Sequence, residues 1–153
     1  MTKMRSDRLG WARLTVIAAA VVIAAHGLIH LMGMVLLWKL GEPGGLRYAD
    51  AVPVPGSAAA YLVGGLWLLA AVLFVTAAAL LAAGRAAWRL TALAAVLVSV
   101  PVIGLAPGQA VAGLIIDGLI LFLVGVSWLR TRKQPVNQPP SAESRMPPAR
   151  RTR

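Results

Sequence analysis

The chain has 153 residues, of which 59% are hydrophobic and only 13% are charged, whereas about a quarter are charged in an ordinary soluble domain. This composition excludes an ordinary soluble globular protein, so lipid is expected to surround most of the chain. The chain has no cysteine, which excludes disulfides, thiolate metal sites and the dithiol chemistry of some four-helix membrane oxidoreductases. The net charge of +10 does not predict nucleic-acid binding, because the basic residues cluster at the ends of apolar runs.

The chain begins with a basic segment, residues 1–13, which is expected to lie in the cytoplasm. The apolar run that follows, from Leu14 to Trp38, is longer than the roughly 20 residues that cross a bilayer. The apolar region of a signal peptide spans only about 7 to 15 residues. We therefore predict an uncleaved first membrane helix over 14–38.

Three further apolar runs predict membrane helices over 58–83, 86–105 and 109–129. All four runs must be helical, because lipid offers no partner to free backbone amides. Only Gly84 and Arg85 separate the second run from the third, so these two helices are expected to be antiparallel neighbours. The predicted fold is all-α: a polytopic membrane protein whose domain, residues 14–130, is an antiparallel bundle of four transmembrane helices.

The basic residues predict the orientation of the bundle. All but two of the 15 Lys and Arg residues fall on one side of the predicted bundle, and the exceptions are Lys39 and Arg47. The positive-inside rule therefore places both termini in the cytoplasm, and the protein in a bacterial cytoplasmic membrane. Tryptophans fall near the predicted helix ends, where an aromatic belt is expected: Trp11, Trp88 and Trp128 on the inner side and Trp38 on the outer side.

The last segment, residues 131–153, combines several prolines with Arg, Ser and Gln and has little apolar content. Such a composition predicts a disordered tail in the cytoplasm. Its basic residues would be attracted to anionic lipid headgroups. The lipid bilayer itself is the main partner that the sequence implies.

Three ionisable side chains lie within the apolar runs. His26 and His30 are four residues apart, so they share one face of the first helix, and Gly33 continues that face. Small residues permit close helix approach, which favours a face turned into the bundle. Asp117 is the acid of the fourth run. Ionisable groups within the membrane are functional candidates, so His26, His30 and Asp117 form a candidate polar cluster.

The depths of these residues are compatible with such a cluster. Counted from the outer helix ends, His30 and Asp117 both lie about 12 Å deep, and His26 lies about 18 Å deep. The three side chains meet if the first and fourth helices touch, as they usually do in an antiparallel bundle. Trp67 of the second helix has a similar depth, so Trp67 and Gly33 are candidate residues for lining the same cavity.

The residues leave several interpretations open. The histidines can serve packing alone, through hydrogen bonds to neighbouring helices. They can form a proton relay or face a quinone, or His26 and His30 can hold a metal ion together with Asp117. Zinc-protease chemistry is excluded, because Gly27 stands where its signature requires Glu. A single subunit cannot supply bis-His haem ligation from one helix face, although a homodimer or a partner subunit could donate the second ligand. No cofactor is expected within a single subunit. Thr76, Ser99 and Ser127 are expected to bond back to their own helices.

The segment AHGLIHLMG, residues 25–33, together with GLWLLAA, residues 65–71, and the turn 85–88, resembles small bacterial four-helix membrane proteins of DoxX-like architecture, which often carry transport-permease labels. The resemblance implies a noncatalytic subunit, or a component that handles small molecules or protons, within a homo-oligomer or a larger membrane complex. A proton-coupled or accessory transport subunit is the alternative. A purely structural membrane protein is the second alternative.

Overall fold

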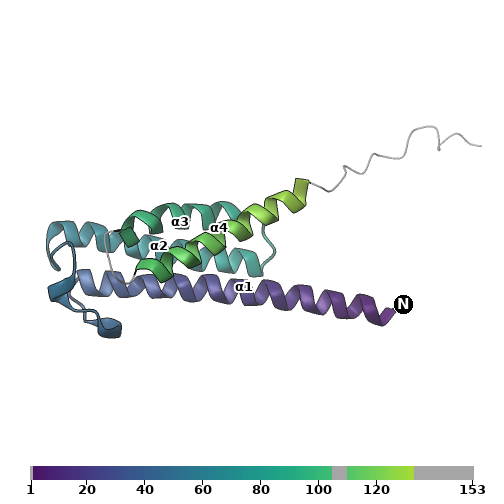
Figure 1. Ribbon diagram of the computed structural model, residues 1–153, viewed down its shortest axis with the longest axis horizontal. Helices are drawn as coiled ribbons and strands as arrows, with labels where there is room; N and C mark the ends of the chain where they lie inside the picture. Colours follow the sequence, from purple (N-terminus) through teal and green to yellow (C-terminus); the bar gives the residue numbers. More distant parts are fainter. Residues whose placement is uncertain (1, 105–109, 133–153) are drawn as a thin grey trace, which may run out of the picture.

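The computed structural model describes residues 2–104 and 110–132. The order of elements is α1 (Thr2–Leu37), the short 3-10 helices η1 (Pro43–Gly45) and η2 (Tyr48–Asp50), α2 (Ala58–Ala82), α3 (Trp88–Gly104) and α4 (Ala110–Arg132) (Figure 1). The prediction of an all-α fold is thereby confirmed, with four main helices in the described residues. The predicted tail lies outside the described residues, apart from 131 and 132, which end α4.

The helix bounds differ from the predicted ones mainly at the first helix. α1 begins at Thr2 and so includes the basic segment, which is rich in the helix formers Arg, Lys, Leu and Met. Segments of three helices are long and apolar enough to cross a membrane: Arg13–Leu37, Ala58–Ala82 and Ala112–Arg130. α3 has 17 residues and is shorter than expected. At a rise of about 1.5 Å per residue it spans about 25 Å.

The helices run alternately up and down the bundle. The start of α1, the α2–α3 turn and the end of α4 lie at one end, and η1 and η2 lie at the other (Figure 1). α2 packs along α1 and α3, whereas α4 packs mainly on α3 and crosses α1 obliquely. The α2–α3 turn includes Gly84, whose φ of +67° lies in the left-handed region that favours glycine.

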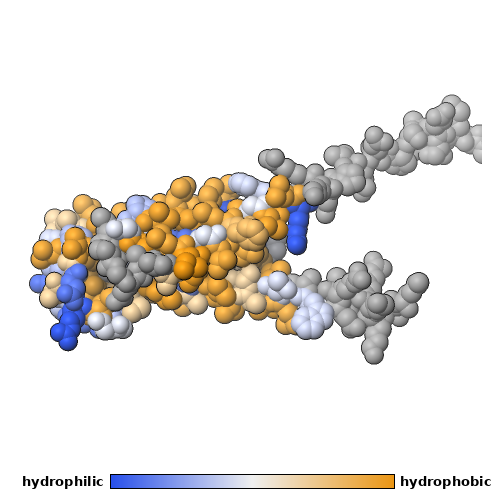
Figure 2. Space-filling view, viewed as in Figure 1, coloured by the Kyte–Doolittle hydropathy of each residue, from blue (hydrophilic) through white to orange (hydrophobic). Residues whose placement is uncertain are grey.

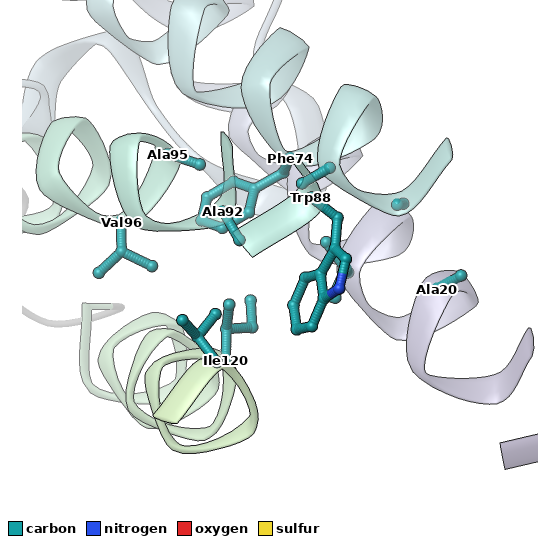
Figure 3. Packing of buried hydrophobic residues seen from close by; sticks show 11 residues of the cluster. Ala20, Phe74, Trp88, Ala92, Ala95, Val96 and Ile120 are labelled. Carbon is teal, nitrogen blue, oxygen red and sulfur yellow. The ribbon is translucent and has the colours of Figure 1, made fainter. Parts of the chain in front are cut away.

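The apolar core joins all four helices in the half of the bundle near the α2–α3 turn. Phe74 from α2, Trp88 from α3 and Ile120 from α4 approach one another there, with alanines of α3 filling the remaining space (Figure 3). Trp88 is only 8% exposed, so the prediction that it belongs to an interfacial belt is wrong. The first residue of α3 points inward, because the short turn before it directs that face toward the core.

Glycines permit the close approach of α1 and α2. A Cβ atom added to Gly27 would lie 2.7 Å from Cβ of Phe74, and one added to Gly33 would overlap the indole of Trp67. These positions therefore exclude any larger side chain while the helices keep their present distance. The close contact also brings the face of α1 that carries both histidines against α2.

The outer surface of the bundle is apolar along its middle and hydrophilic toward its ends (Figure 2). Large aliphatic side chains such as Val21, Leu62 and Leu97 are more than half exposed. Exposed apolar area of this extent is unfavourable in water and is expected of helices that face lipid.

Candidate functional site

The buried face of α1 carries His26 and His30 one helical turn apart. Their side chains are 3% and 1% exposed. The structure brings Asp117 of α4 and Ser99 of α3 to the same place, and these side chains are 1% and 0% exposed. Four polar side chains from three helices therefore meet inside the apolar bundle.

These side chains form one continuous chain of hydrogen bonds. Nε2 of His26 lies 2.9 Å from Oδ1 of Asp117. The other carboxyl oxygen, Oδ2, lies 2.7 Å from Oγ of Ser99, and that hydroxyl lies 2.8 Å from Nε2 of His30. Nδ1 of His30 donates to the backbone carbonyl of His26, at 3.0 Å. The hydrogen bonds thus connect His26 of α1, through Asp117 and Ser99, to His30 of the same helix. We refer to these four residues as the polar network.

Hydrogen-bond counting restricts where the protons of the polar network lie. The carbonyl of His26 can only accept, so Nδ1 of His30 carries hydrogen, and Nε2 of a neutral His30 must accept. Ser99 has a single hydroxyl hydrogen to donate, either to Nε2 of His30 or to Oδ2 of Asp117. If it goes to His30, Asp117 is a neutral acid that donates to Ser99. If it goes to Asp117 while Nε2 of a neutral His26 also donates to Asp117, the carboxyl is ionised and His30 is an imidazolium.

Both arrangements contain the same number of protons and fit the same positions of the heavy atoms. In both, Nε2 of His26 donates to Asp117, and Nδ1 of His26 holds a lone pair. Within the described part of the chain, this nitrogen has no hydrogen-bond partner. It is not fully buried, so another molecule can reach it. Nδ1 of His26 is therefore the atom through which the polar network can meet a further molecule.

Aromatic rings hold the two imidazoles in place. The ring of His26 meets that of His30 nearly edge-on, with centroids 4.7 Å apart and an interplanar angle of 84°. Phe74 packs against both, at 4.9 Å and 5.3 Å, and Trp67 lies 5.2 Å from His30. Rings at these separations are in favourable contact, so the imidazoles have little freedom to turn.

A cavity of about 360 Å³ borders the polar network and extends toward η1 and η2. Its lining includes His26 and His30, Trp67 of α2, and mainly apolar side chains of α1 and α4. Arg47 and Asp50, next to and within η2, contribute the charged groups of its lining. Along α1 the lining runs from His26 to Leu37, about 16 Å at the rise of a helix.

The cavity wall includes side chains on the outer surface of the bundle. Ile29 of α1 lines the cavity and is 55% exposed, and Ala112 of α4 both lines it and is exposed. α1 and α4 contact each other at few places, one of which is the bond between His26 and Asp117. The cavity is therefore bordered on the α1–α4 side by residues that face the surroundings of the bundle.

The sequence-predicted site residues all lie at this place. His26, His30 and Asp117 meet in the polar network, and Gly33 and Trp67 line the cavity. The direct partner of Asp117 is His26, although His30 is the histidine with the same predicted depth, and Asp117 reaches His30 through Ser99. In the parts of the chain that are described, no group of three His, Cys, Asp or Glu side chains has the geometry of a metal site.

Ser99 is the residue that sequence reasoning missed. It was expected to bond back to α3, as Thr76 does to the carbonyl of Val72 in α2 at 2.7 Å, but it bridges Asp117 and His30 instead. Its place in an apolar run gave no signal that distinguished it from Thr76. The structure distinguishes the two residues by burial: Ser99 is 0% exposed, whereas Thr76 is exposed.

No family model, curated protein or solved structure matches this chain. The geometry of the polar network and of its cavity is therefore what indicates a function for this protein.

Proposed function

We propose that this chain is a multi-pass protein of the bacterial cytoplasmic membrane that binds a small, mainly apolar molecule in the cavity beside the polar network. It acts as a noncatalytic, DoxX-like component of a membrane assembly, one that handles small molecules and protons. The observation that carries the proposal is the cavity of about 360 Å³, whose lining combines apolar walls with two buried imidazoles. Such a combination is typical of small-molecule sites.

The chemistry of the lining defines the kind of ligand. Apolar walls favour an apolar body, and the free lone pair on Nδ1 of His26 favours one hydrogen-bond donor, such as a hydroxyl, at one end. Exposed Ile29 and Ala112 on the cavity wall support entry from the lipid, between α1 and α4. A ligand that partitions into lipid would reach the site without crossing water.

The proposed orientation has both termini in the cytoplasm. Arg13, Arg85 and Arg130 lie near the end of the bundle where α1 starts and α4 ends, whereas η1 and η2 lie at the other end. The positive-inside rule supports a cytoplasmic position for the first end. The cavity then lies in the outer half of the membrane.

Binding of a defined probe tests the proposal. We expect 4-nitroanisole and 4-nitrophenol, two small aromatic molecules, to bind the purified protein in lipid nanodiscs and to quench tryptophan fluorescence through Trp67. The variant Ala112→Phe places a ring in the cavity and should weaken binding about ten-fold or more. The control Leu119→Phe adds a ring at a position of α4 that is 56% exposed and should leave binding unchanged. Equal binding to both variants, or no binding to the unmodified protein, would contradict the proposal.

A further inference from the structure

The polar network has one feature that ligand binding alone does not require. Oδ2 of Asp117, Oγ of Ser99 and Nε2 of His30 follow one another at 2.7 Å and 2.8 Å, and His26 continues the same line through Oδ1 at 2.9 Å. Each member can both give and receive a proton, and no gap separates them. We infer that the polar network is a proton relay, which takes a proton from an acidic hydroxyl group of the cavity ligand at His26 and carries it to His30; the hydroxyl must be acidic, because the transfer separates charge in an apolar surrounding. The inference rests on the proposed ligand site.

The starting state follows from the cost of separating charge in an apolar surrounding. The neutral arrangement is favoured, in which His26 donates from Nε2 and Asp117 donates from Oδ2 to Ser99. Ser99 then donates to Nε2 of a neutral His30. The ligand hydroxyl donates to the lone pair on Nδ1 of His26.

The transfer moves one proton over four short steps. The ligand O–H bond breaks and the proton joins Nδ1 of His26, while the proton on Nε2 of His26 passes to Oδ1 of Asp117. The proton on Oδ2 of Asp117 passes to Oγ of Ser99, whose own proton passes to Nε2 of His30. The ligand becomes an anion and His30 an imidazolium, while the three residues between them stay neutral. No electron is transferred and no other reactant is needed.

Every hydrogen bond of the polar network remains satisfied after the transfer. Nδ1 of His26 now donates to the ligand anion, and Nε2 of His26 accepts from Asp117. Ser99 donates to Asp117 and accepts from His30, whose Nδ1 still donates to the backbone carbonyl. Among the described residues, the charged side chains that line the cavity are Arg47, which favours the anion, and Asp50, which opposes it. The heavy atoms of the protein need not move for the relay to work in either direction.

The chain offers a direct test, because it contains only two histidines. Nitrogen-15 NMR of histidine-labelled protein distinguishes the two neutral tautomers from the imidazolium. Without ligand we expect His26 with its proton on Nε2 and His30 with its proton on Nδ1. With bound 4-nitrophenol, at a pH where the free phenol is mostly protonated, we expect His26 to change tautomer, His30 to become an imidazolium, and the visible band of the phenolate to appear.

Two variants interrupt the relay at separate points. Asp117→Asn keeps an acceptor for His26 and a donor for Ser99 but has no proton to pass on, and Ser99→Ala removes the link to His30. Both should bind 4-nitrophenol and lose the phenolate band and the imidazolium signal. Thr76→Ala, which removes a hydroxyl that bonds only to its own helix, is the matched control and should keep both. Helical content measured by circular dichroism establishes that each variant is folded.

The possible outcomes separate the relay from the ligand site. If 4-nitrophenol binds, and Ala112→Phe weakens its binding, but His30 stays neutral, the relay is wrong and the ligand site stands. The relay is also wrong, and the ligand site still stands, if both Asp117→Asn and Ser99→Ala form the phenolate, because the proton then stops at His26. If neither 4-nitrophenol nor 4-nitroanisole, which lacks the hydroxyl, binds in the cavity, the proposed function is wrong and the relay falls with it.

Discussion

Nε2 of His26 lies 2.9 Å from Oδ1 of Asp117, although the two residues are 91 positions apart in the sequence. α1 and α4 contact each other at few other places, so this bond is a principal tie between the first and last helices. Both partners are buried among apolar side chains. A polar group in such a place must keep its partner, because an unpaired buried donor or acceptor is costly.

The protonation state of Asp117 has a consequence for stability. In the neutral arrangement, an asparagine at this position reproduces every hydrogen bond of the acid. We expect Asp117→Asn to change the free energy of unfolding by less than about 1 kcal/mol, and Asp117→Ala to lower it by about 1–3 kcal/mol, since His26 and Ser99 lose a partner. Reversible unfolding in mixed micelles measures both. An asparagine variant as unstable as the alanine variant would show that Asp117 is ionised.

Two adjacent glycines of α2 provide a matched pair of substitutions. A Cβ atom at Gly64 would overlap the indole of Trp38, whereas one at Gly65 would meet nothing within 4 Å. We expect Gly64→Ala to destabilise the protein by about 1–3 kcal/mol through the displacement of Trp38. Gly65→Ala should be neutral or stabilising by up to about 1 kcal/mol, because alanine has a higher helix propensity than glycine. Thermal unfolding followed by circular dichroism compares the two, and similar midpoints would argue against the close contact of Trp38 with α2.

The start of α2 depends on a side-chain cap. Oγ of Ser57 accepts a hydrogen bond from the backbone amide of Ala60, at 3.1 Å, and so satisfies one of the free amides of the first turn. Ser57→Ala should lower the free energy of unfolding by about 0.5–2 kcal/mol, and Ser57→Asp should restore most of it. Amide hydrogen exchange would locate the loss, which is expected at the first turn of α2. Uniform loss over the whole helix would contradict a local cap.

The absence of cysteine from the chain permits a direct test of orientation. Ala49 in η2 and Ala86 in the α2–α3 turn are exposed and lie at opposite ends of the bundle. In intact cells, a maleimide that does not cross membranes should label Ala49→Cys but label Ala86→Cys only after lysis. Ala95→Cys, at a position that is 0% exposed, is the control that should stay unlabelled. The reverse pattern would place both termini outside the cytoplasm.

Most of the helical framework could be predicted from length and hydropathy alone. The predicted second helix, 58–83, and the observed one, Ala58–Ala82, agree almost to the residue, since Ser57 caps one end and Gly84 follows the other. The start of α1 at Thr2 was not predicted, because the prediction began the helix with the apolar run, whereas the basic segment before that run is also rich in helix formers. The burial of Trp88 was missed for a different reason, since a tryptophan near a helix end has the same local sequence whether it faces lipid or the core.

For the candidate site too, the sequence predicts which residues matter, whereas the contacts between them depend on the tertiary structure. That His26, His30 and Asp117 are unusual could be read from the chain, because ionisable residues in apolar runs stand out against their neighbours. The crossing of α4 over α1 and α3 determines the rest. It brings Asp117 to His26, lets Ser99 complete the connection to His30, and leaves a cavity beside them. Helix periodicity determines which residues share a face. The angle and depth at which two faces meet are determined by packing between helices, to which side chains from the whole bundle contribute.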